Sequence, residues 1–218
     1  MRSIILGLAV LFAQAFWFCP STTFAVTLGA LQDADVATGD TWDDVTVGTS
    51  PWIVENYSLA TSVIGHIQFD VSSFSPGTVQ SAVLRLFQDF NSTNGVSYDI
   101  YRVDSPWDEA TVTYNTRPAL DSTIYSTLAI ADSANQVWRE WDVTSLVQEW
   151  VDGTSTNYGL AILRDPDEQP WPYFRSKDYN LGEEGFPELV VTIPEPASLS
   201  LVGLACGMLW MRRSTKSG

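Results

Sequence analysis

Residues Ile100–Pro118 read IYRVDSPWDEATVTYNTRP, and this stretch combines two runs of strand-forming residues with a forced break between them. The first run ends before Pro106, because proline has no backbone N–H to donate to a strand ladder. The second run, Thr111–Tyr114, is rich in the β-branched and aromatic residues that strands favour, and Pro118 ends it. The stretch therefore predicts two strands joined by a short connection, as in an all-β protein.

The connection between these two runs carries the pattern of a helix N-terminus. Ser105 and Asp108 match a capping box, and Pro106 takes the first helical position. We expect a single helical turn here. Trp107 lies on that turn, and its large apolar ring is expected to plug the end of a β-core rather than to contact a ligand.

Short runs rich in Val, Ile, Thr, Tyr, Phe and Trp recur along residues 26–193, separated by clusters of Gly, Pro, Asn, Asp and Ser. This spacing is typical of an antiparallel β-sandwich. These 168 residues suffice for one domain, and we predict an all-β sandwich of the jelly-roll type with one short helix. The expected strands are Thr27–Leu31, Asp44–Gly48, Ser62–Asp70, Gln80–Phe90, Ser97–Val103, Thr111–Tyr114, Thr123–Ala131, Val137–Asp142, Gly159–Arg164, Tyr173–Lys177 and Glu188–Ile193.

The one helix is expected at Asp142–Val151, where the apolar residues change to helical spacing. Asp142 is a suitable N-terminal cap and Gly153 a suitable stop. Four apolar residues share one face of this segment, and Trp150 is the largest of them, so we expect it to be part of the core.

Several ordered motifs resemble the DNRLRE domain family, which is also described as a carbohydrate-binding module family of surface proteins. The resemblance covers about Thr27–Ile193 and implies a β-sandwich that binds polysaccharide; the family includes modules that bind alginate. The motifs are YRVDSPWDEATVTYNTRP, which begins at Tyr101, GHIQFDVSSF at Gly65–Phe74, SAVLRLF at Ser81–Phe87, WDVTSLVQEWVDGTSTNYGLAI at Trp141–Ile162, and FRSKD and FPELVVTI near the end.

Residues 1–25 have the layout of a secretory signal peptide. One positive residue, Arg2, precedes an apolar run, and small side chains lie three and one positions before a cut after Ala25. The alternative is a lipoprotein signal that uses Cys19, but Phe18 is too bulky for the position before a lipidated cysteine.

The other end, residues 194–218, resembles a PEP-CTERM sorting signal. Pro194, Glu195 and Pro196 precede the apolar run Ala197–Met211, and Arg212 and Arg213 follow it. The resemblance implies recognition by an exosortase during a transient association with the inner membrane through a helix. The run spans only ~22 Å as a helix, which is short for a permanent transmembrane helix, although a plain C-terminal anchor is the alternative.

Cysteine usage and charge exclude several function classes for residues 26–193. Cys19 and Cys206 both lie in the terminal segments, so the domain has no thiol for a disulfide, a metal or catalysis. It holds 7 basic and 25 acidic residues, a net charge of −18. This charge repels nucleic acid and polyanionic glycans, and no nucleic-acid partner is expected.

The sequence gives little support to an enzyme. His66 is the only histidine, it lies in an expected strand, and no nucleophile motif is near it. We interpret it as a solvent-facing or hydrogen-bonded core residue. Carboxylate pairs such as Asp43–Asp44 have no pattern that identifies a glycosidase, so a polysaccharide-degrading enzyme is the minor alternative.

A structural calcium ion is the cofactor that the sequence suggests, because extracellular β-sandwiches often hold calcium with loop carboxylates. Asp33 and Asp35 lie beside the first expected strand and Asp178 beside a late one, and the first and last strands of a sandwich are often neighbours. These three are the candidate ligands; the alternative is that they are solvated surface acids.

Two pairs of aromatic residues in or beside expected loops are the candidate polysaccharide platforms. Trp52 with Tyr57 forms one pair, and Trp171 with Tyr173 forms the other. Few basic residues accompany them, namely Arg164, Arg175 and Lys177, so a neutral glycan is expected. The alternative is that the tryptophans belong to rigid proline turns and cap the sandwich.

We therefore predict an exported, non-catalytic domain that binds polysaccharide or packs in an extracellular matrix or biofilm, at the cell surface or beyond it. A purely structural adhesion protein without glycan affinity is the main alternative, because the single domain stands between two export signals without a fused enzyme.

Overall fold

The computed structural model describes residues 23–39, 41–54, 62–90, 95–131, 134–164, 173–180 and 184–194. Ten strands and one helix occur in these ranges, and every strand pair is antiparallel. The elements are β1 Thr23–Thr38, β2 Trp52–Ile53, β3 Ser62–Phe69, β4 Ser81–Phe90, β5 Val96–Arg102, β6 Ser126–Ile130, β7 Val137–Asp142, α1 Thr144–Val151, β8 Leu160–Arg164, β9 Tyr173–Arg175 and β10 Glu188–Pro194. The predicted all-β sandwich with one short helix is confirmed.

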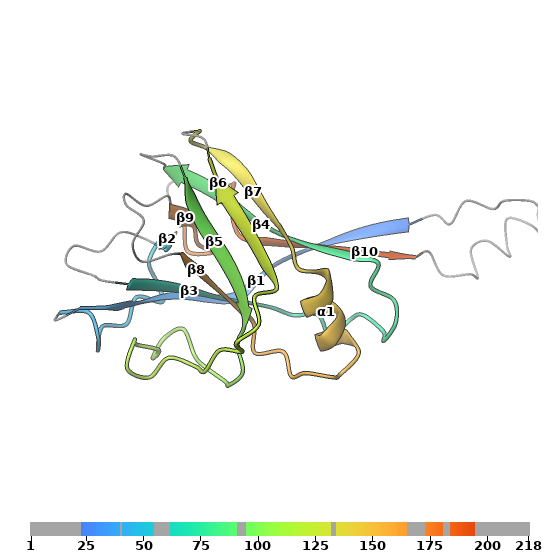
Figure 1. The fold of residues 1–218 in the computed structure, drawn as a ribbon, viewed down its shortest axis with the longest axis horizontal. Coiled ribbons are helices and arrows are strands. Elements are labelled where there is room, and N and C mark those ends of the chain that lie inside the picture. Colours follow the sequence, from blue (N-terminus) through green and yellow to red (C-terminus); the bar gives the residue numbers. More distant parts are fainter. Residues whose placement is uncertain are drawn as a thin grey trace, which may run out of the picture.

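Two sheets share the long strand β1 (Figure 1). Its first half pairs with β10, which continues to β4, β7, β9 and β2; we call this layer sheet A. Its second half pairs with β3, followed by β8, β5 and β6; this layer is sheet B. The register shifts between Ala30 and Gln32, so a bulge marks the point where β1 passes from one sheet to the other.

Alternation along the strands places the main core between the sheets. In β4, Leu84 and Leu86 are fully buried and Arg85 and Phe87 are only partly buried, because successive side chains point to opposite faces. Trp141 on β7 and Trp150 on α1 belong to the same core. The expected core position of Trp150 is confirmed.

A second, smaller cluster lies on the outer face of sheet B. In β3, Val63 and Ile67 belong to the main core, whereas Ile64, between them in the sequence, belongs to the second cluster. The second cluster also contains Val112 of the loop between β5 and β6, so this loop covers the outer face of sheet B.

The predicted strand at Thr111–Tyr114 is wrong, because backbone groups of this loop form hydrogen bonds within the loop and Val112 packs against sheet B. Val112 donates its backbone N–H to Asp108 at 2.9 Å, and Thr113 shares its hydroxyl with Thr116. The predicted capping box is also wrong. The Ser105 hydroxyl instead accepts the N–H of Ala119 at 3.0 Å. The hydrogen-bonded turn begins later, at Asp108.

Other boundaries differ in ways that follow from length and capping. The predicted strand Asp44–Gly48 is reduced to one bridge, between Val47 and Asp35. The predicted strand Thr123–Ala131 shortens to β6, and the predicted Thr27–Leu31 extends to the 16 residues of β1. The helix begins at Thr144 rather than Asp142, although the Asp142 carboxylate still accepts the Thr144 N–H at 2.9 Å.

Candidate functional site

Two of the predicted platform residues meet on the outer face of sheet A. Trp52 lies in the two-residue strand β2, beside a loop, and pairs with Arg175 of β9. Its ring contacts Tyr173 edge-on at 4.8 Å between centroids, and Tyr179 at 5.0 Å. Tyr57 and Trp171, the other predicted members, lie outside the described residues.

This contact between β2 and β9 continues as a row of rings and arginines across two further strands, β4 and β7. The guanidinium of Arg175 lies 4.1 Å from the Tyr179 ring centroid and 4.4 Å from that of Phe87. Phe87 contacts Trp138 at 5.3 Å, and Arg85 lies over Trp138 at 4.4 Å. We call this row the aromatic strip; it consists of Trp52, Tyr173, Tyr179, Arg175, Phe87, Trp138 and Arg85.

The strip follows from strand alternation in sheet A. Ile53, Phe174 and Leu86 point into the main core and are fully buried. Their neighbours Trp52, Tyr173 and Phe87 therefore point outwards, and each is only partly buried. Phe87 and Trp138 were missed by the sequence interpretation because aromatic residues inside strands resemble core residues.

Both arginines of the strip are held by carboxylates. Arg175 donates to Asp89 through Nη2 at 2.7 Å and Nε at 3.0 Å, and Arg85 contacts Glu188 at 2.6 Å and Glu140 at 3.1 Å. Three carboxylates thus surround two guanidinium groups, and the strip carries no net positive charge. The rings are ordered by cations, but the local field does not favour a polyanion.

Two buried aspartates of β1 hold the segments that carry the strip. Asp35 accepts the backbone N–H of Val54, directly after β2, at 2.8 Å. Asp33 accepts the backbone N–H of Lys177, two residues after β9, at 2.7 Å. Burial raises the pKa of Asp33 to about 7. These contacts give both carboxylates a structural role.

Another partly exposed aromatic residue, Trp107, lies on the outer face of sheet B. Trp107 is partly buried against the second cluster, and its indole N–H donates to the Tyr158 carbonyl at 2.8 Å. The prediction that it plugs the end of the β-core needs correction, because it packs against the second cluster on the outer face of sheet B. It lines a hollow of about 520 Å³.

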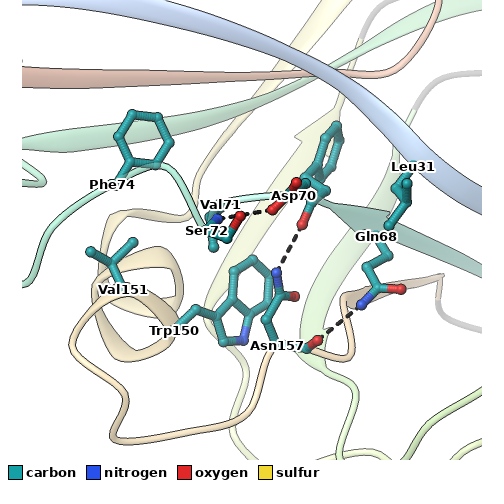
Figure 2. A pocket seen from close by; sticks show the side chains of 10 residues that line it. Leu31, Gln68, Asp70, Val71, Ser72, Phe74, Trp150, Val151 and Asn157 are labelled. Carbon is teal, nitrogen blue, oxygen red and sulfur yellow. Dashed lines mark hydrogen bonds between the residues drawn. The ribbon is translucent and has the colours of Figure 1, made fainter.

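A groove of about 400 Å³ lies between the end of β3 and the end of α1 (Figure 2). Asn157 donates to the Phe69 carbonyl at 2.8 Å, Gln68 donates to the Asn157 carbonyl at 2.9 Å, and the Asp70 carboxylate accepts the Ser72 N–H at 2.9 Å. These polar groups join neighbouring segments of the fold, so we interpret the groove as a structural joint.

Comparison with known families finds a match over most of the chain. Residues 25–193 match carbohydrate-binding module family 96, CBM96. The chain belongs to this family. No curated protein matches the chain. The prediction of a carbohydrate-binding domain is thus confirmed, and CBM96 is a family of binding modules.

The calcium ligands predicted for the CBM96 domain are not gathered into one set in the described residues. Asp33 and Asp35 accept the backbone hydrogen bonds given above, and Asp178 contacts the Lys177 ammonium at 3.0 Å. In the same ranges, no group of three or more His, Cys, Asp or Glu side chains is placed to hold a metal ion. Calcium stays a prediction from the sequence.

The histidine of the CBM96 domain is fully buried beneath Trp107, with ring centroids 5.6 Å apart. His66 is thus a core residue rather than a solvent-facing one. Neither ring nitrogen has a hydrogen-bond partner of normal geometry in the described residues, although the backbones of Ala34 and Ile64 are close enough to act on its pKa. Burial, with a contribution from the Arg117 charge, lowers its pKa to about 4. The neutral, enclosed ring has no access to a substrate.

Of the predicted sorting residues, only Pro194 is described, at the end of β10. Glu195, Pro196, Arg212 and Arg213 lie outside the described ranges, as does the apolar run Ala197–Met211. None of the helices within those ranges is long and apolar enough to cross a membrane.

Proposed function

We propose that this CBM96 domain is an exported, non-catalytic module that binds a neutral polysaccharide along the aromatic strip. The observation that carries the proposal is the row of rings on one sheet face, in which Trp52, Tyr173, Phe87 and Trp138 are partly exposed and Tyr179 is buried behind them. The rings are tilted against one another by 60° to 83°, but they follow one another along one face of the sheet, so an extended sugar chain can contact several of them in turn.

The rings supply binding energy through the apolar faces of pyranoses. Covering ~100 Å² of apolar surface contributes ~2.5 kcal/mol before the costs of association and ordering. Trp52 at one end and Trp138 at the other offer two such contacts. Two contacts of this size support millimolar to micromolar affinity.

The charge of the strip favours a neutral polymer over an acidic one. Arg85 and Arg175 already have carboxylate partners, so a uronate would have to compete with Glu140, Glu188 or Asp89. The net charge of the whole chain, −15, adds a long-range repulsion. Alginate, which some modules of the DNRLRE family bind, is therefore the less suitable ligand.

The terminal segments support export of the domain. Residues 1–25 have the layout of a signal peptide, and residues 194–218 resemble a PEP-CTERM signal read by an exosortase. We infer a final location at the cell surface or in the extracellular matrix. Intact-mass measurement of secreted protein tests this, because retention of Leu199–Met211 would indicate a plain anchor.

Two single variants test the strip directly. Trp52→Ala and Trp138→Ala are expected to lose retention in gels that contain hydroxyethyl cellulose, mixed-linkage β-glucan or galactomannan, with little change in melting temperature. Tyr101→Ala, a partly buried aromatic residue on β5 of sheet B, is the matched control. Loss of stability without a selective loss of retention would assign the rings to a structural adhesion protein.

Structural calcium is a separate proposal that rests on the sequence alone. Millimolar calcium, added after treatment with a chelator, is expected to raise the melting temperature of the wild type and to leave that of Asp178→Asn unchanged. An unchanged melting temperature of the wild type would contradict a structural calcium site in this domain.

A further inference from the structure

The loop between β5 and β6 is a firmly seated part of the fold. The Asn115 N–H donates to the Asp43 carbonyl at 3.0 Å, and the Asn115 amide donates to Asp44 at 2.8 Å. The backbone of Glu109 lies so close to Gly48 that a Cβ at that glycine would collide with the Glu109 carbonyl. The surface that this loop presents is therefore preformed.

Trp107 is the aromatic centre of that surface. Its ring contacts His66, and its N–H is fixed to the Tyr158 carbonyl, so the orientation of the indole is set from within. The side chain remains partly exposed in the hollow of about 520 Å³. The other residues that line this hollow are Pro106, Asp108, Thr111, Val112 and Thr116.

The lining combines the two kinds of group that hold a sugar. Trp107 and Pro106 offer apolar surface for the C–H face of a pyranose. Asp108, Thr111 and Thr116 are exposed and carry a carboxylate and two hydroxyls, which can hydrogen-bond sugar hydroxyls. The Asp108 carboxylate disfavours a uronate, so the lining suits a neutral residue.

We infer that the Trp107 hollow is a second binding site for a neutral glycan, on the face of the domain opposite the aromatic strip. This inference rests on the proposed carbohydrate-binding function. It adds a consequence: one domain with two sites on opposite faces links two polysaccharide chains, which is a matrix-building activity rather than simple attachment.

The opposite placement follows from the two clusters of the fold. The strip lies on the outer face of sheet A, and the hollow lies in the loop that covers the outer face of sheet B. Figure 1 shows this loop, in light green, below β3 and β8 and away from β2, β9 and β4. The strip and the hollow thus lie on the outer faces of different sheets, and the main core lies between those sheets.

Titration calorimetry with oligosaccharides is the primary test. The full chain is first screened for retention by hydroxyethyl cellulose, mixed-linkage β-glucan and galactomannan, and a hexaose of the retained polymer is then titrated. We expect two equivalents bound by the wild type and one by Thr111→Glu, which adds bulk and charge to the hollow. Thr46→Glu, the same change at an exposed threonine outside the hollow, should still bind two.

A polymer assay tests bridging. The wild type should precipitate or thicken the retained polymer, whereas Thr111→Glu and Trp52→Ala should each be retained by it without cross-linking it. Trp107→Phe, which loses the indole N–H but keeps a ring, should weaken the second site by about tenfold or less and keep the fold.

The outcomes separate the two proposals. Binding of one equivalent that Trp52→Ala abolishes and Thr111→Glu leaves unchanged would keep the strip and overturn the second site. Binding that Thr111→Glu alone abolishes would move the site to the hollow, overturning both the strip and the bridging. Failure of all three polymers to retain the wild type would overturn neutral-glycan binding and this inference with it.

Discussion

The carboxylate of Asp35 accepts the backbone N–H of Val54 at 2.8 Å, and Val54 has a φ of 59°. A β-branched residue rarely adopts positive φ, because its side chain then crowds the backbone. Both residues are fully buried. The hydrogen bond therefore compensates for backbone strain directly after β2, the short strand that places Trp52 on the aromatic strip.

The first prediction tests this link. Asp35→Ala leaves the Val54 N–H without this buried acceptor, so we expect a loss of ~1 to 3 kcal/mol in the free energy of unfolding. Asp35→Asn keeps an acceptor oxygen and should lose clearly less. Urea denaturation at pH 7 measures both variants. Equal stability of Asp35→Ala and the wild type would show that the bond does not hold the strand.

The second prediction concerns acid stability and His66. Its pKa is about 4 in the folded protein, below the ordinary 6.5, because it is buried. The unfolded chain binds the extra proton between these values, so this residue lowers stability as the pH falls from 6.5 to 4. The loss over that range is roughly 3 kcal/mol.

His66→Leu removes the proton and fills a similar volume. The difference in stability between this variant and the wild type should grow in favour of the variant as the pH falls from 6.5 to 4. Comparing the two proteins at each pH is necessary because Asp33, whose pKa is raised to about 7, acts in the opposite direction. A difference that stays constant with pH would contradict the buried, unprotonated state.

Much of the fold could be predicted from alternation in the sequence. Val137–Asp142 matches β7 at both ends, and the predicted strands near β3, β4, β5, β8 and β10 differ by one or two residues at their boundaries. In β4, β5 and β10 buried and partly buried residues alternate, so the period of two is visible, whereas β3 and β8 are buried on both faces and are recognised by their apolar, β-branched composition. Where a segment is too short, as in β2, no period exists to detect.

The candidate site was harder to predict because its residues come from different strands. Trp52 and Tyr173 were predicted, each with a partner near in sequence, but their actual contact joins residues 121 positions apart. Phe87 could have been found from its neighbours. It lies between Leu86 and Gln88, which are buried, and so has the parity of the outward residue Arg85.

The third prediction compares two tryptophans in different environments. Trp150 is 6% exposed and belongs to the main core, so Trp150→Ala should cost ~3 to 5 kcal/mol. Trp107 is partly exposed on the second cluster, so Trp107→Ala should cost about half as much. Thermal or urea denaturation decides this. A larger loss of stability for Trp107→Ala than for Trp150→Ala would contradict the peripheral position of Trp107.

The last prediction uses the strip to change specificity. Glu140 and Glu188 hold Arg85 at 3.1 and 2.6 Å. Replacing both by Gln leaves the guanidinium over Trp138 but removes its charged partners, so the strip gains a cation for a uronate carboxylate. We expect the double variant to be retained by alginate gels at low salt and released as salt rises, because the new attraction is screened. Asp44→Asn with Asp70→Asn, which removes the same charge elsewhere, is the control and should gain no such retention. If both double variants gain retention equally, net charge alone would explain the effect, and the arginine of the strip would have no part in choosing the glycan.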